Sequence, residues 1–282
     1  MSHEFFKFSG HDSFHCRNLW LKKGFDFVYR GNQFSEDSGV ELGVGRNMVE
    51  AIRHWLKSFD LVDEQNSITQ WAMNVFSDDG WDPYLEDETT LWLLHYHLNK
   101  KRYASAYPIV FTDLRKTNPD FSASHFCKLV MEKDAKQNEN TLNRDFSVLI
   151  RNYLPQNGQD REENYTGVLQ ELDLVHEVKS GMNAVYHIEN KRQSSIPAHL
   201  VLYCILAFEE FEQSISVKSL MGKGTTIGNI FALSPEMLEN KLLEACQLFP
   251  DMVYIHDSGI KELQFKGLKP LPLDVLSAYY VN

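Results

Sequence analysis

The chain has 282 residues, of which 43% are hydrophobic and 12% aromatic, and its formal net charge is -11. This length and apolar content suit a folded protein with a sizeable core in two or three units, and they exclude a disordered chain. The acidic balance also excludes a general electrostatic attraction to nucleic acid, because that affinity comes from lysine and arginine placed on phosphates. Any contact with DNA must therefore come from a local basic patch.

The cysteines and the apolar runs predict where the protein resides. The cysteines are widely spaced, with no C-x-x-C pair and no secretory leader before them, so we expect reduced thiols in a cytoplasmic protein. They are Cys16, Cys127, Cys204 and Cys246. The most apolar run, residues 200–208, is shorter than the roughly 18 residues that a membrane-spanning helix requires. We therefore expect no membrane partner.

The first segment with chemical potential lies between aromatic residues near the N-terminus. Ionisable side chains gather around Gly10, namely His11, Asp12, His15 and Arg17. A site that cleaves a DNA strand needs a base or nucleophile, a positive group beside the phosphate and often a metal ion. His11, Asp12 and Arg17 are therefore the catalytic candidates, with Asp12 as a candidate ligand for Mg²⁺ or Mn²⁺. The alternative is structural: Asp12 and Arg17 pair to fix the segment, and the histidines form local hydrogen bonds.

The following residues predict a helix-turn-helix arrangement. A helix over residues 18–23 is expected to end at Gly24, because glycine terminates helices and Lys22 and Lys23 suit the negative helix end. A short helix over residues 35–42 then leads through a glycine turn into an amphipathic helix over residues 46–59.

The long helix has one apolar face and one mostly basic face. The predicted DNA-contacting residues are those of the polar face together with the two lysines of the first helix: Arg46, Asn47, Arg53, Lys57, Lys22 and Lys23. A strand or hairpin over residues 67–76 would supply the wing of a winged helix. The alternative is an ordinary amphipathic helix whose charged face is solvated.

The middle of the chain repeats this order of elements. After a loop over residues 77–87, a helix over 89–100 carries two histidines on different faces, which favours packing over metal binding. The expected elements that follow are helices over 122–133 and 141–153, the second capped by Thr141, a short helix over 168–174, and hairpin strands over 175–178 and 184–188.

The last third repeats the order of helices followed by a hairpin. Its expected elements are helices over 196–211, 216–221 and 235–248, with Ser234 and Pro235 beginning the last of these, and a hairpin formed by 249–256 and 261–265. The pattern predicts an α+β, mainly α-helical protein of tandem winged-helix-like modules. The expected domains are 1–106, 107–192 and 193–282.

Two catalytic motifs are weak or absent. Residues 222–226 resemble a phosphate loop but lack the spacing and the Ser or Thr of a Walker A motif. Asp173, Glu177 and Lys179 resemble the carboxylate and lysine set of a metal-dependent nuclease. Such short acidic-x-Lys matches are common by chance.

A family resemblance rests on several early segments. Residues 8–17, 20–24, 42–49 and 52–56 together resemble the signature of a bacterial family whose named member is SspB, of the Ssp DNA phosphorothioation system. Residues 141–153 and 228–233 are similar to weaker landmarks of the same family. The first hundred residues carry the specific part of the likeness.

The resemblance implies a DNA-nicking component of a system that replaces a non-bridging phosphate oxygen of DNA with sulfur and serves antiviral defence. It implies double-stranded DNA, a cysteine desulfurase, an ATPase and a sulfur-transferase subunit as partners. One common form of the motif has Glu-Thr-Phe-Pro where this chain has residues 12–15. Asp12 keeps the carboxylate with a shorter reach, whereas His15 departs from the pattern.

Three functions therefore remain open. The first is a DNA-nicking component, with the polar face of the long helix on DNA and the His11 to Arg17 segment near the scissile phosphate. The second is a non-catalytic DNA-binding adaptor whose N-terminal segment is structural. The third is a protein-interaction scaffold, which the acidic balance would permit.

Overall fold

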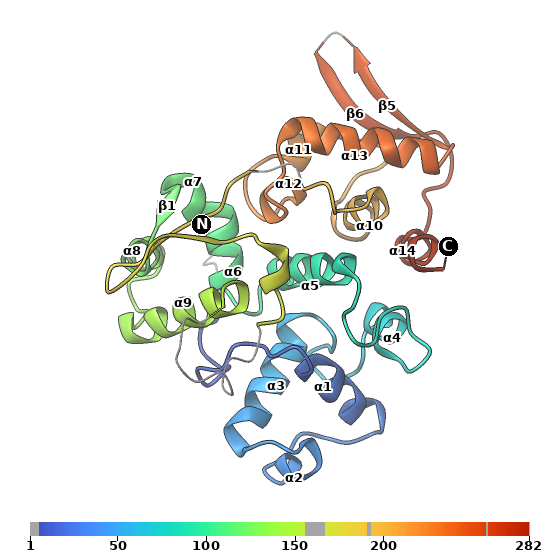
Figure 1. Ribbon diagram of the computed structural model, residues 1–282. Coiled ribbons are helices and arrows are strands. Elements are labelled where there is room, and N and C mark those ends of the chain that lie inside the picture. Colours follow the sequence, from blue (N-terminus) through green and yellow to red (C-terminus); the bar gives the residue numbers. More distant parts are fainter. Residues whose placement is uncertain (1–5, 156–166, 191–192, 258, 282) are drawn as a thin grey trace. The chain divides into compact units, whose positions relative to one another are not determined.

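The computed structural model describes residues 6–155, 167–190, 193–257 and 259–281. It divides into two compact units, Met1–Ile188 and Glu189–Asn282. Helices predominate, and each unit holds a small three-stranded antiparallel sheet, which confirms the α+β, mainly α-helical class (Figure 1). The division lies close to the expected boundary after residue 192, whereas the boundary expected after residue 106 falls inside the first unit. The arrangement as three modules stays a prediction.

The first unit begins with three helices that pack together, α1 (Trp20–Tyr29), α2 (Ser38–Leu42) and α3 (Arg46–Ser58) (Figure 1). The turn before α3 forms as expected, with Gly43 in the left-handed conformation that ends α2. The expectation that Gly24 ends the first helix was wrong. A Cβ on Gly24 would lie 2.7 Å from Cγ2 of Ile52, so this glycine permits close packing of α1 on α3. The helix therefore continues to Tyr29.

The expected wing over residues 67–76 was also wrong. Only an isolated bridge between Val62 and Ile68 has strand character there, and helix α4 (Gln70–Phe76) follows it. The buried positions of this stretch are Trp71, Ala72, Val75 and Phe76, which share one face only in a helix. Burial of that face against the unit's core thus overrides the high strand propensity of its aromatic and branched residues.

The remainder of the first unit is built around two long helices. Its elements are α5 (Glu88–Lys101), α6 (Ala106–Pro108), the π-helix η1 (Ile109–Leu114), α7 (Arg115–Thr117), β1 (Asp120–Phe121), α8 (Ala123–Lys133), α9 (Glu139–Tyr153), the 3-10 helix η2 (Gln170–Leu172), β2 (His176–Lys179) and β3 (Val185–His187). The strands pair antiparallel in the order β1-β3-β2, which adds a strand to the predicted hairpin. Helix α9 begins earlier than predicted, because the Asn138 side chain accepts the backbone N–H of Thr141 and is the true cap.

The second unit is a separate helical and hairpin body. Its elements are α10 (Ala198–Phe208), β4 (Ser214–Ser216), α11 (Val217–Leu220), α12 (Ile227–Ile230), α13 (Pro235–Leu248), β5 (Met252–Asp257), β6 (Ile260–Phe265) and α14 (Pro272–Tyr280). The expected cap of α13 is present, since Ser234 accepts the N–H of Met237 and Pro235 opens the helix. The sheet order is β4-β6-β5, and the unpredicted α14 packs against α10.

The structure gives the state of the cysteines and the length and apolar character of the helices. All four cysteines carry free thiols, as expected, and Cys16, Cys127 and Cys204 are buried. Within the described ranges, no helix combines the length and the apolar character needed to cross a bilayer.

Candidate functional site

The N-terminal segment follows an unusual backbone path. Ser9, Gly10, Asp12 and Ser13 have φ angles of 71°, 101°, 44° and 66°. Left-handed φ is uncommon outside glycine, and each such residue costs on the order of 1 kcal/mol or more. A run of this kind persists only when the surrounding structure holds it in place. The contacts that hold this turn therefore define the candidate site.

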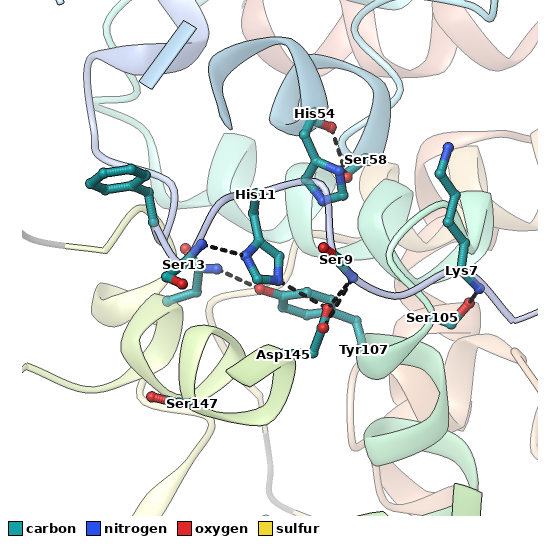
Figure 2. Close-up of polar contacts among 12 residues, drawn as sticks. Lys7, Ser9, His11, Ser13, His54, Ser58, Ser105, Tyr107, Asp145 and Ser147 are labelled. Atoms are coloured by element: carbon teal, nitrogen blue, oxygen red, sulfur yellow. Dashed lines mark hydrogen bonds and ion pairs between the residues drawn. The ribbon is translucent and has the colours of Figure 1, made fainter. Parts of the chain in front are cut away.

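A buried carboxylate on α9 is the first of these contacts. Both oxygens of Asp145 accept the backbone N–H of Ser9 at 3.0 Å, and Oδ1 lies 2.9 Å from Nε2 of His11 (Figure 2). Asp145 is only 6% exposed. A buried charge requires hydrogen-bonding partners, and the turn supplies them. The turn and α9 thus stabilise each other.

The hydrogen bonds of His11 fix its tautomer. The backbone N–H of Ser13 donates to Nδ1 of His11 at 3.2 Å, so Nδ1 carries a lone pair and the proton sits on Nε2, which donates to Asp145. The ring also stacks on Trp55 of α3, with centroids 6.0 Å apart and planes 13° from parallel. His11 is 2% exposed. In this arrangement both ring nitrogens are engaged within the chain, and neither can accept a proton from a substrate.

A second buried histidine lies against the same turn. His54 of α3 packs edge-on against His11, with ring centroids 5.5 Å apart, and a Cβ added to Gly10 would come 2.6 Å from its Nδ1. Its Nε2 is buried and has no hydrogen-bond partner in the part of the chain that the structure describes. Burial, helped by the neighbouring His11 and Lys7, lowers the pKa of His54 to about 3. His54 is therefore neutral, and the site accepts no side chain at Gly10.

Further contacts from α9 and α3 secure the end of the segment. Nη2 of Arg151 donates to the carbonyl of Ser13 at 2.6 Å, and Nε1 of Trp55 donates to the carbonyl of Phe14 at 3.1 Å. Side chains of both helices thus also bind the backbone at the end of the segment. Residues 9 to 16 are clamped between α3 and α9.

Cys16 lies at the buried end of this clamp. Its backbone N–H donates to Oδ1 of Asn152 at 2.9 Å, and the Asn152 amide donates to the hydroxyl of Tyr107 at 2.5 Å. Burial raises the pKa of the Cys16 thiol well above its ordinary value, and burial also raises that of Tyr107, against the opposing effect of its bond to Asn152. Both groups stay protonated at neutral pH. They are packing groups and not nucleophiles.

The other predicted catalytic residues lie elsewhere around the turn. Asp12 is exposed, one residue after the clamped His11. Arg17 is half-buried, and its guanidinium carbon lies 5.0 Å from the ring centre of Trp20. The structure therefore joins His11 to Asp145 and leaves the Asp12 carboxylate facing solvent.

The predicted DNA-contacting residues of α3 separate into two groups. Arg46 and Asn47 are exposed in the first turn of the helix, where Nη2 of Arg46 lies 2.5 Å from Oε1 of Glu36. Arg53 is partly exposed. Lys57 is 7% exposed, and its Nζ donates to the carbonyl of Glu64 at 2.9 Å. Only the N-terminal part of the helix presents its polar face to solvent.

The two lysines of α1 also differ. Lys22 is 7% exposed, and its Nζ lies 2.5 Å from Oδ1 of Asp26 and 3.2 Å from Oδ1 of Asp78. Its charge is therefore balanced within the unit. Lys23 is exposed.

Comparison with known proteins identifies the family. The family model described as "Protein of unknown function (DUF4007)" matches residues 8–280. The chain belongs to the DUF4007 family. No curated protein matches it.

Solved structures share the fold of this DUF4007 chain. One described as "SspB crystal structure" has a TM-score of 0.83 at 24% identity, with 98% of this chain and 88% of that chain covered. Another, described as "Magnesium ion-bound SspB crystal structure", has a TM-score of 0.85 at 23% identity over the same shares. At this identity the likeness establishes the fold. It confirms, at the level of the fold, the resemblance to SspB that the early segments indicate.

The arrangement of potential metal-ligand side chains in the DUF4007 chain shows what kind of metal site it could form. Within the described residues, no group of three or more His, Cys, Asp or Glu side chains is placed to hold a metal ion. Asp12 offers one exposed carboxylate. Mg²⁺ is often held by one or two carboxylates together with waters and substrate phosphates. The described residues therefore do not form a protein-only metal site, and Asp12 fits only a site that a phosphate completes.

Sequence reasoning missed the α9 side of the DUF4007 site. Asp145 and Asn152 are both buried on α9, together with apolar residues that include Leu142, Phe146 and Leu149. A carboxylate and an amide among buried positions need hydrogen-bonding partners. Polar residues at apolar positions of the helical pattern are therefore the signal that could have indicated Asp145 and Asn152.

Proposed function

We propose that this protein is a DNA-nicking component of a bacterial DNA phosphorothioate modification and antiviral defence system of the Ssp kind. The observation that carries the proposal is the match to the SspB fold over 98% of the chain. The landmark residues of the early segments support it. On this proposal the protein works in the cytoplasm with a cysteine desulfurase, an ATPase and a sulfur-transferase subunit.

The surface proposed to contact DNA is the start of α3. Arg46, Asn47 and Arg53 lie on the exposed part of this helix, directly after the glycine turn. In helix-turn-helix proteins the N-terminal residues of the second helix reach the base edges, and nearby cations contact phosphates. Lys57 and Lys22 are assigned to the fold instead, because each is only 7% exposed and its ammonium group is engaged within the first unit. Arg46 and Arg53 have glutamate partners too, Glu36 and Glu50, but these pairs are open to solvent.

The N-terminal turn is the proposed reaction site. Its exposed carboxylate, Asp12, follows a residue that α9 fixes in place, so its backbone position is set before DNA arrives. Asp12 would hold Mg²⁺ or Mn²⁺ together with DNA phosphate oxygens, and the ion would stabilise negative charge at the phosphate. His11 positions this turn and transfers no proton, because both of its nitrogens are engaged.

A non-catalytic DNA-binding adaptor is the second candidate function. The burial of His11 and the engagement of both its ring nitrogens favour it, since the residue best suited to general base chemistry is occupied. An adaptor would use the same exposed part of α3. It would need no metal at Asp12.

A plasmid assay distinguishes these functions. Supercoiled plasmid is incubated with the purified protein and Mg²⁺ or Mn²⁺, and open-circular product is measured for the wild type, Asp12→Asn and Asp79→Asn. Asparagine tolerates the left-handed φ of residue 12, and Asp79 is an exposed carboxylate in the segment that follows α4. Nicking is expected from the wild type and Asp79→Asn but not from Asp12→Asn.

The remaining outcomes are equally informative. DNA binding without any nick would support the adaptor. Neither nicking nor DNA binding would contradict both candidates and leave the protein-interaction scaffold. Equal nicking by all three proteins would remove Asp12 from the proposed reaction site.

A further inference from the structure

The middle elements of the first unit follow the order of a winged helix. The helical segment α6, η1 and α7 leads through β1 into the pair α8 and α9, and the β2–β3 hairpin comes later. The sheet order β1-β3-β2 puts the first strand beside the last, as in that motif. In helix-turn-helix proteins the second helix of the pair is the one that enters the major groove of DNA. Helix α9 has that position here.

The packing of α9 determines which of its sides faces solvent. The ring of Phe146 lies 5.5 Å from that of Phe126 on α8 and 5.8 Å from that of Tyr186 on β3, measured between centroids. Side chains at three-, four- and seven-residue spacing on the opposite side are exposed or half-buried. They are Asn140, Asn143, Arg144, Ser147 and Arg151. These five residues are termed the outer face of α9.

The outer face carries the side chains that read base edges. Asparagine pairs with adenine through two hydrogen bonds, and arginine pairs with guanine in the same way. Within the described ranges, Asn140 and Arg144 form no side-chain hydrogen bond or ion pair. Asn143 accepts only the thiol of Cys127, at 3.6 Å, and its NH₂ group has no such engagement. These groups are therefore available to a ligand.

The charge of this region suits a phosphate backbone better than the chain as a whole does. Residues 123–153 contain five Lys or Arg and four Asp or Glu, whereas the whole chain contains 28 and 39. Of the four carboxylates, Asp145 is buried against the turn. Glu139 is exposed, but at 3.6 residues per turn it lies about 140° around the helix from Arg144. In the hairpin, the exposed Glu177 and Lys179 offset each other, so α9 alone supplies the cations.

The corresponding helix of the second unit has a different surface. There the sheet order β4-β6-β5 follows the same pattern, and α13 comes directly before the hairpin. It exposes Leu243, Leu248 and Glu244, and its one lysine, Lys241, is buried. Protein interfaces are centred on large apolar or aromatic anchors, which the outer face of α9 lacks. The side chains, and not the topology alone, therefore distinguish α9 as a surface for DNA.

The opposite side of α9 holds the N-terminal turn. Figure 2 shows Asp145 facing the turn and Ser147 on the other side of the helix. Arg151 joins the two sides, because it belongs to the outer face and its Nη2 donates to the carbonyl of Ser13 at 2.6 Å. Ser13 directly follows Asp12, the exposed carboxylate of the turn. The outer face, roughly 16 Å long from Asn140 to Arg151, thus ends beside the candidate reaction site.

We propose that the outer face of α9 reads the base sequence of duplex DNA in the major groove and thereby sets where the Asp12 turn meets the backbone. Asn140, Asn143 and Arg144 contact base edges, and Arg151 contacts a phosphate beside the turn. This surface is additional to the exposed start of α3. Base reading by α9 needs no nicking, whereas its effect on the position of a cut rests on the proposed function.

The test selects preferred sequences from a pool of duplexes with the full chain. Each duplex has a random centre of about ten base pairs, one turn of the double helix. Divalent metal ions are left out, so that binding is measured without nicking. Bound duplexes are recovered and sequenced over successive rounds. We expect enrichment of particular bases at about three or four neighbouring positions, since that many side chains of one helix reach base edges.

A matched pair of variants locates the preference. Asn140→Ala with Arg144→Ala removes one amide and one cation from the outer face, and Asn240→Ala with Lys218→Ala removes the same groups from exposed positions of the second unit. The α9 variant is expected to bind the selected duplex at least about tenfold more weakly and to lose the enrichment. The control is expected to keep both. Equal thermal melts of the two variants would show that the fold is retained.

A second measurement tests the link to the turn. With Mg²⁺ or Mn²⁺ added, the wild type is expected to cut the selected duplex at a fixed distance from the selected bases. Cuts spread evenly along the duplex would contradict the link between α9 and the position of the Asp12 turn.

Several results would overturn base reading by α9. One is a wild type without any preference, and another is the same preference in the α9 variant, which would leave this face to a protein partner. An equal loss of affinity for selected and random duplexes would reduce α9 to a phosphate contact. An α9-dependent preference without any nicking would support this proposal and contradict the nicking function. Plasmid nicking without an α9-dependent preference would do the reverse.

Discussion

Asp145 holds His11 across 134 positions of sequence, with Oδ1 of the carboxylate 2.9 Å from Nε2 of the imidazole. The same carboxylate accepts the backbone N–H of Ser9, so one buried side chain fixes the start and the middle of a left-handed turn. This relationship makes α9 part of any function that the N-terminal segment has. It also distinguishes His11, which is buried and positions the turn, from Asp12, whose carboxylate is exposed.

Removal of this carboxylate should destabilise the first unit. Asp145→Ala leaves the N–H groups of Ser9 and His11 without their acceptor in a buried environment, and we expect a loss of about 2–4 kcal/mol in the free energy of unfolding. Urea denaturation followed by tryptophan fluorescence measures the change. Ser147→Ala is the matched control, because this exposed serine lies on the same helix (Figure 2). Equal midpoints for the two variants would show that the carboxylate does not hold the turn.

Gly10 should be intolerant of substitution for two separable reasons. Gly10→Ala places a Cβ at a φ of +101° and brings it 2.6 Å from Nδ1 of His54. Gly31→Ala has a φ of +85° but nothing within 4 Å of the added atom, so it isolates the backbone cost. We expect Gly31→Ala to destabilise by about 1 kcal/mol and Gly10→Ala by clearly more. Thermal unfolding of both variants measures the difference. Similar losses would mean that His54 moves aside freely.

Local pattern was enough to predict the long helices. The apolar period of α3 and the Ser234-Pro235 start of α13 placed both elements well, because their signals lie within a few residues. Gly24 and residues 70–76 were misread, since close packing on α3 and burial against the core decide them. Packing and burial act between segments that are separated in sequence, and the apolar pattern within one segment does not show which other segment it contacts.

The candidate site was predicted only in part. The polar residues around Gly10 pointed to the segment that the structure clamps, but the residues that fix it lie on α3 and α9. No periodicity within the segment reveals a partner more than a hundred positions away. Asp145 and Asn152 could have been noticed as polar residues on an apolar helix face. Their pairing with His11 and Cys16 required the fold.

His54 should make the stability of the protein depend on acid pH. Its pKa falls from an ordinary value of 6.5 to about 3 on folding, with burial as the main cause. Between these values the unfolded chain binds a proton that the folded chain does not, so the contribution of this residue to stability is complete above pH 6.5 and is lost as pH falls toward 3. The slope for one group approaches about 1.4 kcal/mol per pH unit.

The pH effect can be isolated by substitution. His54→Gln cannot be protonated, so its stability, measured by urea denaturation at several pH values, should fall less steeply than that of the wild type from pH 6 to pH 4. His125→Gln changes an exposed histidine and should keep the slope of the wild type. Parallel curves for the wild type and His54→Gln would show that His54 titrates normally in the folded protein.

The exposed start of α3 should determine any affinity for DNA. Reversal of charge in Arg46→Glu with Arg53→Glu is expected to weaken binding to duplex DNA and to reduce the dependence of affinity on salt, because each lost phosphate contact removes about one unit of the log–log slope. Anisotropy titrations at several salt concentrations measure both quantities. Lys128→Glu carries a charge reversal to an exposed position on α8 and should change little. If Arg46 and Arg53 contact phosphates, their loss must reduce the number of counterions released on binding and so lower the slope. An unchanged slope in the α3 variant would therefore place DNA binding elsewhere.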